Sequence, residues 1–129
     1  MIGCRRRGNR EAEIQRAIVA ALRVALPPGA IIHHSGHEHR GGDGRAKLAQ
    51  AIGVGMGVHP GFADLVVVAE GRVAFLEVKT AKGQLSGDQQ AFRDIIRTQG
   101  LPYAVVRSID DALCALGSHG FEIRASVWP

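Results

Sequence analysis

A chain of 129 residues fits one domain of ordinary size, because compact domains cluster at roughly 100 to 150 residues. With 46% hydrophobic and 22% charged residues, the composition is that of a globular protein and excludes a disordered or fibrous one. Sixteen Lys and Arg against 12 Asp and Glu leave a net charge of +4, which favours a polyanionic partner such as nucleic acid.

The compartment is indicated by the cysteines and by the start of the chain. Cys4 and Cys114 are too few for a disulfide scaffold or a cysteine-rich zinc site. The arginine-rich start, Met1 to Arg10, is not followed by a long apolar segment, so it fits neither a signal peptide nor a membrane anchor. We therefore expect a cytoplasmic protein without membrane contact, in which residues 1–8 form a flexible basic tail.

The first half of the chain predicts a long helix, a short strand and a second helix. The long helix runs from its N-cap, Asn9, to Leu26, and a proline pair and a glycine then stop it. A strand follows over residues 30–34, and a polar loop rich in glycine and histidine over 35–44. Residues 45–52 predict a short helix, after which five glycines and prolines force an irregular path to the next element.

The second half predicts a β-hairpin followed by a helix, a strand and a helix. The hairpin strands are residues 64–68 and 72–79, which are joined by a turn at Glu70 and Gly71. The later elements are expected, in chain order, as a helix over 86–99, a strand over 103–107, a helix over 109–116 after a Ser108 cap, and an edge strand over 121–127. We find no repeat and no linker, so the prediction is one α/β domain around a central hairpin.

Two carboxylates are predicted to face each other across the hairpin. A two-residue turn at 70–71 pairs Asp64 with Glu77, and like charges at opposed positions destabilise a strand pair unless a cation compensates. Lys79 shares the face of Glu77, because side chains alternate along a strand. Mg²⁺ binds through one or two carboxylates plus phosphate oxygens. These three residues therefore predict metal-assisted phosphodiester hydrolysis, in which Lys79 orients or deprotonates the attacking water.

Glu11 is a candidate for a further metal ligand. At about 100° per residue it falls within the apolar stripe of the first helix, whereas Glu13 falls on the opposite, solvent side. A carboxylate that faces inward is costly without a cation or hydrogen bonds. We therefore expect Glu11 to be an outer or additional ligand of the metal.

Gln89 has two compatible interpretations. The segment Ser86 to Gln89 matches a capping box, in which both side chains satisfy the first amides of a helix. The positive end of the same helix can also point toward phosphate. We expect Gln89 to belong to the site in addition to capping the helix.

Basic and histidine side chains around the site predict contacts with the DNA backbone. The residues expected to make them are His33, His34, Arg40, Arg45 and Lys82. The four histidines between positions 33 and 39 fit no closed four-ligand zinc pattern, but a histidine-dependent zinc hydrolase stays open as an alternative.

Two further alternatives stay open. A Glu-x-Lys in a strand is commonly a solvated cross-strand pair, although Glu77 lies in an apolar run that disfavours this interpretation. The other alternative is a non-catalytic DNA-binding module with the same fold and basic surface. Such a module gains nothing from acids that repel phosphate, so Asp64, Glu77 and Lys79 together argue against it.

Taken together, these motifs resemble the virus-type replication-repair nucleases (VRR-NUC), a branch of the PD-(D/E)XK nuclease superfamily. The matching blocks are Glu11 to Gln15, the His33-His34 loop, Gly57 to Asp64, Phe75 to Lys79, Gly83 to Ser86 with Gln89, and Val105 to Ala112. Each block alone is common, and their order and spacing carry the resemblance. The family's usual proline before the aspartate is Ala63 here, at a position that shapes the backbone and carries no chemistry.

The resemblance implies a single nuclease domain over residues 1–129, with a restriction-endonuclease-like core in which helices flank a central mixed β-sheet. It implies Mg²⁺, or Mn²⁺ in its place, as the cofactor. The site residues that it implies are Asp64, Glu77, Glu11 and the Val78 backbone carbonyl as metal ligands, Lys79 beside the attacking water, and Gln89. It also implies a homodimeric phage or prophage endonuclease for branched DNA such as flaps or four-way junctions, because a two-fold dimer would present two active sites to two strands.

Overall fold

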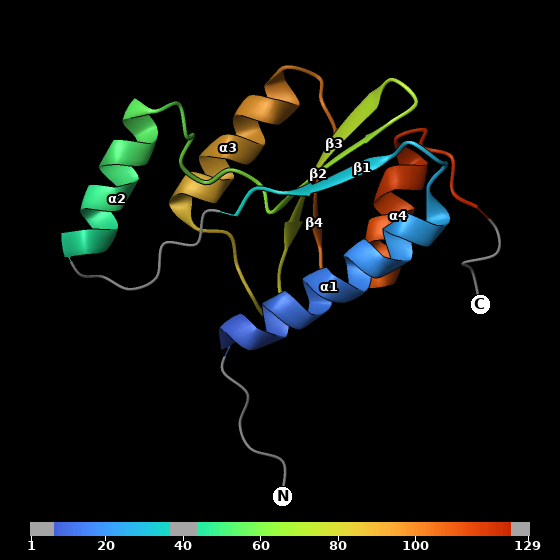
Figure 1. The fold of residues 1–129 in the computed structure, drawn as a ribbon, viewed down its shortest axis with the longest axis horizontal. Helices are drawn as coiled ribbons and strands as arrows, with labels where there is room; N and C mark the ends of the chain where they lie inside the picture. The colour runs from blue at the N-terminus through green and yellow to red at the C-terminus, as the bar shows by residue number, and fades with distance from the viewer. Residues whose placement is uncertain (1–6, 37–43, 125–129) are drawn as a thin grey trace, which may run out of the picture.

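The structure, a computed structural model, describes residues 7–36 and 44–124, over which the chain forms four helices and four strands (Figure 1). In chain order they are α1 (Arg7–Ala25), β1 (Ile31–His34), α2 (Gly44–Gly55), β2 (Leu65–Ala69), β3 (Arg72–Val78), α3 (Gly87–Thr98), β4 (Tyr103–Val106) and α4 (Ile109–Ser118). This order confirms the predicted succession of elements up to α4.

The four strands form one mixed sheet in the order β1-β2-β3-β4. The first three strands are antiparallel to their neighbours, and β4 runs parallel to β3 because α3 crosses over between them. The predicted hairpin is β2 and β3, and its turn residues Glu70 and Gly71 both have positive φ, at 50° and 77°, as a tight type I′ turn requires. Leu65 pairs with Leu76, so the predicted register is correct and leads one step further to Asp64 opposite Glu77.

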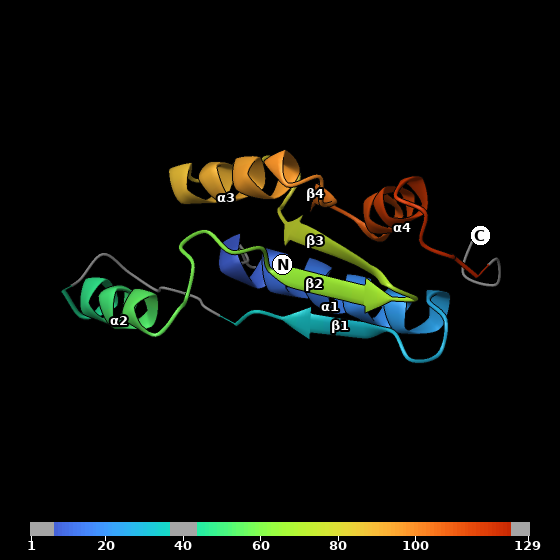
Figure 2. The same cartoon turned by 90° about the horizontal axis from the view of Figure 1, so that it is seen from above.

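Helices cover both faces of the sheet (Figure 1, Figure 2). On one face, α1 and α4 pack on inward side chains of the hairpin in the larger core, and α3 packs on the other face in a smaller cluster around Phe92 and Tyr103. Leu65 and Leu76 belong to the larger core. Because side chains alternate along a strand, Asp64 and Glu77 belong to the face that α3 covers.

The helix α2 stands beyond the end of the sheet rather than over either face (Figure 2). Several of its large apolar side chains are exposed, and Met56, directly after it, is 83% exposed. The exposed large apolar residues of this segment are Leu48, Ile52, Val54 and Met56. Exposure of this many large apolar side chains is unusual on a helix of a single domain, where one apolar stripe normally faces the core.

Two predicted helix boundaries are wrong. Asn9 lies inside α1 and is not its N-cap, because the helix already begins at Arg7, within the segment expected to be a flexible tail. The second helix runs on through Gly53 to Gly55, where an irregular segment was expected. An asparagine or a glycine costs at most about 1 kcal/mol in a helix, so neither residue stops one whose neighbours favour it.

The predicted edge strand over 121–127 is not formed in the part that the structure describes. Residues 121–124 adopt no strand, and residues 125–127 lie outside the described residues. Phe121 is buried in the larger core, and the Arg124 N–H donates to the carbonyl oxygen of Ala25 at 2.9 Å. Burial of one aromatic ring therefore decides the path of this segment, in place of strand pairing.

Candidate active site

Asp64 is held at the start of β2 from both neighbouring strands. Its carboxylate Oδ2 accepts a hydrogen bond from the backbone N–H of Val78 at 2.8 Å. Its carbonyl oxygen accepts one from the Ser35 N–H at 3.0 Å, and His34 Nδ1 lies 3.2 Å from the same oxygen. The carboxylate is therefore fixed in direction.

Glu77 is the buried charged residue of the described chain, with a side chain only 1% exposed. Its Oε1 accepts a hydrogen bond from Gln89 Nε2 at 2.7 Å, whereas its Oε2 has no hydrogen-bond partner. The pKa of Glu77 is raised to about 9, mainly by burial of the carboxyl and secondly by the neighbouring Asp64 carboxyl. The positive charge of Lys79 acts in the opposite direction and lowers this pKa.

This pair of carboxyls fits a divalent cation. A buried carboxylate oxygen without a partner is costly, and two acids side by side cannot both ionise without compensation. Magnesium prefers oxygen ligands and needs only one or two carboxylates, since it keeps several waters. Asp64 and Glu77 offer these ligands, and the partnerless Oε2 of Glu77 is the atom that such an ion would satisfy.

Gln89 caps α3 and also contacts Glu77. Its backbone N–H donates to Ser86 Oγ at 3.2 Å and its Oε1 accepts from the Ser86 N–H at 2.9 Å, which completes the capping box of α3. Its Nε2 remains free of the cap and donates to Glu77. One side chain thus anchors α3 and orients the buried carboxyl.

Gly61 brings the loop before Asp64 into direct contact with the first turn of α3. A Cβ atom at this position would lie 2.2 Å from the carbonyl oxygen of Asp88, and the residue has a φ of +73°. Both the space and the backbone angle therefore require glycine. This close approach ties the segment that carries Asp64 to the turn that carries Gln89.

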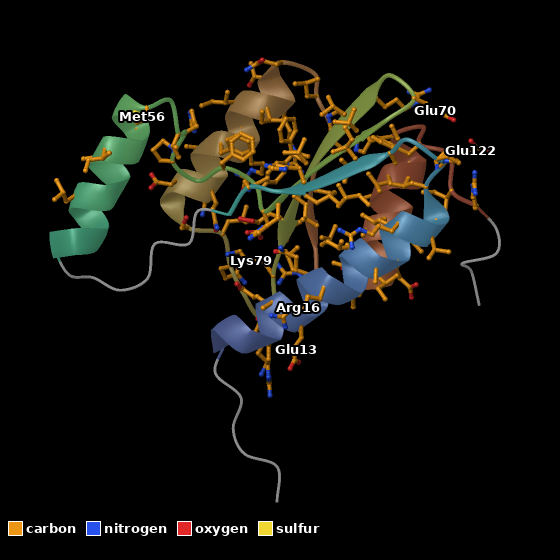
Figure 3. All side chains as sticks on the ribbon, in the orientation of Figure 1. Glu13, Arg16, Met56, Glu70, Lys79 and Glu122 are labelled. Carbon is orange, nitrogen blue, oxygen red and sulfur yellow. The ribbon has the colours of Figure 1, made fainter. Side chains whose placement is uncertain are left out.

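Lys79 lies directly after β3, at the end opposite the hairpin turn at Glu70 (Figure 3). Its backbone N–H donates to the carbonyl oxygen of Val106 at 3.1 Å, so the parallel pairing with β4 extends to this residue. A Cβ atom on Gly83 would lie 3.4 Å from Lys79 Cδ, which shows that the turn after β3 packs against the lysine stem. The lysine is therefore held by the turn that follows it.

Arg107 fixes that turn, a function that the sequence analysis missed. Its Nη1 donates to the carbonyl oxygens of Thr80 and Gly83, the latter at 2.8 Å. Its backbone N–H donates to Asp111 Oδ2 at 2.9 Å, in the first turn of α4. An arginine after a buried strand carries no signal for this contact, because the turn that it binds lies 24 to 27 residues earlier in the chain.

A pocket of about 330 Å³ opens over the two carboxyls. Its lining includes Asp64, Glu77, Gln89 and the expected DNA-contacting residue His34. Glu11 is half-buried in α1 and does not line this pocket. Within residues 7–36 and 44–124, no group of three or more His, Cys, Asp and Glu side chains converges to hold a metal ion. The structure thus brings two of the three predicted acids together with Gln89.

The other predicted DNA-contacting residues are dispersed. His33 in β1 and Lys82 after β3 are exposed, but neither lines the pocket. Arg45 belongs to α2, whereas Arg40 lies outside the described residues, as do the histidines at 37 and 39 on which the zinc alternative depends.

Two residues near the site were missed. Gln15 of α1 places its Nε2 2.9 Å from His34 Nδ1, and through it contacts the segment that holds Asp64. The signal for Gln15 was its position one helical turn after Glu11. His59 lines the pocket, and only the folded loop reveals this position.

The comparisons with known proteins identify the family of the chain. The VRR-NUC domain family model matches residues 41–110, which is 70 of the 129 residues. The chain belongs to the VRR-NUC family. This membership places it in a nuclease family, whose domain implies DNA as the partner and whose members are typically metal-dependent.

Solved structures support the same fold. One, described as a "VRR_NUC domain protein", has a TM-score of 0.63 and 20% identity and covers 93% of this chain and 91% of its own. Another, described as a "VRR_NUC domain", has a TM-score of 0.57 and 19% identity, with 87% and 98% covered. The comparison with curated proteins gave no match. The fold is therefore the PD-(D/E)XK-like mixed sheet that the resemblance implied.

None of the described helices has the length and apolar character needed to cross a membrane.

Proposed function

We propose that this VRR-NUC protein is a metal-dependent DNA endonuclease that hydrolyses phosphodiester bonds with Mg²⁺, or with Mn²⁺ in its place. One observation carries the proposal: the carboxyl of Glu77 is almost fully buried beside Asp64, and its Oε2 has no partner. Two acids held together in this way are costly to the fold unless a cation compensates. A solvated cross-strand pair would be exposed, so the burial of Glu77 argues against that alternative.

Asp64 and Glu77 would hold the ion, with Glu11 and the Val78 backbone carbonyl proposed as further ligands. When bound, the metal lowers the pKa of a bound water and polarises the scissile phosphate. Lys79 would orient the attacking water and offset the charge that develops on the pentacovalent phosphorus. Gln89 keeps the Glu77 carboxyl in one orientation by its 2.7 Å hydrogen bond to Oε1.

The proposed substrate is branched DNA, such as a flap or a four-way junction, and the proposed assembly is a homodimer. The net charge of +4 supports a polyanionic partner. The exposed apolar side chains of Leu48 and Ile52, one helical turn apart on α2, support a second copy of the chain, because such side chains are often covered by a partner in solution. Dimers of this kind would act in the cytoplasm, where an exposed free cysteine such as Cys114 stays reduced.

The proposal is tested by cleavage of labelled flap, four-way junction and linear DNA with Mg²⁺, with Mn²⁺ and with a chelator. We expect metal-dependent cleavage of the branched substrates by the natural protein. Glu77→Gln should abolish cleavage and keep DNA binding, whereas the exposed Glu122→Gln, which makes the same chemical change, should keep both. Binding of all substrates without cleavage of any would instead identify a non-catalytic DNA-binding module.

A further inference from the structure

The pocket over the two carboxyls is lined by two chemically different groups of residues. The polar group includes Asp64, Glu77 and Gln89, together with His34, Ser35, Ser86 and Asp88. The other group, here called the apolar wall, consists of apolar and ring-bearing residues of the α2 segment and of the loop that follows it. These residues are Val54, Val58, His59, Pro60 and Phe62. Phosphodiester hydrolysis itself makes no use of an apolar wall, so this wall calls for another explanation.

His59 is the most conspicuous member of this wall, because its ring is both exposed and held in place. Its Nδ1 lies 2.9 Å from the carbonyl oxygen of Pro60. Its ring centroid lies 5.7 Å from that of Phe92, which in turn packs on Phe62 at 4.8 Å and on Tyr103 at 6.1 Å. The buried aromatic cluster thus supports an imidazole that is open to solvent at the pocket.

We propose that this apolar wall binds one unpaired nucleobase of the DNA, next to the phosphate that the carboxyls and Lys79 address. The inference rests on the proposed nuclease function and names the substrate class of the same site. The base stacks on the ring of His59 and packs against Val58, while its phosphate lies over Asp64 and Glu77. Stacking on an aromatic ring tolerates any base, since every base has a π-face.

The size of the pocket favours one nucleotide over a duplex. Its volume of about 330 Å³ is at the lower end of the roughly 300 to 1,000 Å³ of small-ligand pockets. A base that is paired within a helix cannot enter such a hollow, and it must first leave its stack at a cost of a few kcal/mol. This cost is smallest where the base is already unpaired, as it is in a flap. The wall therefore selects phosphates that adjoin an unpaired nucleotide.

The experiment compares two branched substrates that differ at one position. Once the cleaved phosphate has been mapped, the unpaired nucleotide beside it is replaced by an abasic residue, which removes the base and keeps the backbone. We expect kcat/KM to fall about 5- to 150-fold on the abasic substrate, as the loss of one base–aromatic stack predicts. The readout is the ratio of the two kcat/KM values, which cancels general losses of activity.

Variants of His59 then test whether its ring causes the difference in kcat/KM between the two substrates. His59→Ala should reduce the ratio to about twofold or less, and His59→Phe should keep it, because phenylalanine retains an aromatic face. His59→Leu keeps apolar bulk against Phe92 without an aromatic ring and serves in place of His59→Ala if that variant does not fold. The matched control is His119→Ala, an exposed histidine at the end of α4, which should leave the ratio unchanged.

Each outcome is decisive. Equal kcat/KM on the two substrates would overturn the inference and leave the nuclease function intact. A ratio that survives in His59→Ala or His59→Leu would also overturn it, because the base would then be bound elsewhere. Absence of cleavage of any substrate would overturn the proposed function itself, and the inference with it.

Discussion

The buried acid pair makes the stability of the metal-free protein depend on pH in a direction opposite to that of most carboxylates. The pKa of Glu77 is raised from 4.5 to about 9 in the folded chain. Between these values the folded pair binds one proton that the unfolded chain has released, so the free energy of unfolding falls as the pH rises. The slope is about 1.4 kcal/mol per pH unit for one proton. From pH 6 to pH 8 the loss is therefore about 3 kcal/mol, a large share of the 5–15 kcal/mol that is typical of a domain.

Urea unfolding followed by circular dichroism at pH 6, 7 and 8 in the presence of a chelator measures this loss. Glu77→Gln is neutral at every pH and lacks the titrating group, so its stability should exceed that of the natural protein by a margin that grows by about 3 kcal/mol over this range. All other side chains are the same in both proteins, so their contributions cancel in the difference. Mg²⁺ should reduce the margin, because it replaces the proton as the compensating charge. Parallel pH profiles of the two proteins would refute the argument.

Three further outcomes follow from the contacts around the site. Glu77→Ala should lower cleavage by at least a thousandfold while the Kd for DNA stays the same or decreases, and full activity in this variant would refute the site. Arg107→Ala should lower kcat about tenfold with an unchanged Kd, because the turn beside Lys79 loses its anchor, and guanidinium ion in solution should restore part of the rate. Gly61→Ala should lower the free energy of unfolding by about 3 kcal/mol and Gly57→Ala, whose φ is +99° but whose Cβ would meet nothing within 4 Å, by about 1 kcal/mol; equal losses would contradict the proposed backbone clash.

Local patterns along the chain were sufficient for the elements up to α4 and for the acid pair, but not for the segment after α4. The alternation of side chains and a two-residue turn at Glu70 and Gly71 determine which residues of the hairpin face each other, so Asp64 opposite Glu77 followed from counting alone. The capping box from Ser86 to Gln89 could likewise be predicted from the sequence, because its two partners are only three residues apart. Boundaries were less accurate at Asn9 and in α2, where weak local preferences compete with continued helix formation.

Tertiary structure decided everything that depends on residues far apart in the chain. It buried Glu77 under α3 while Asp64 stayed partly exposed, and thereby produced the raised pKa and the partnerless Oε2. It also brought Arg107 to the turn after Lys79 and placed His59 at the pocket. None of these contacts has a sequence signature, because each depends on how the helices and loops pack on the sheet. The sequence by itself determined which chemical groups share a strand pair, and only the packing decided how deeply they are buried and what surrounds them.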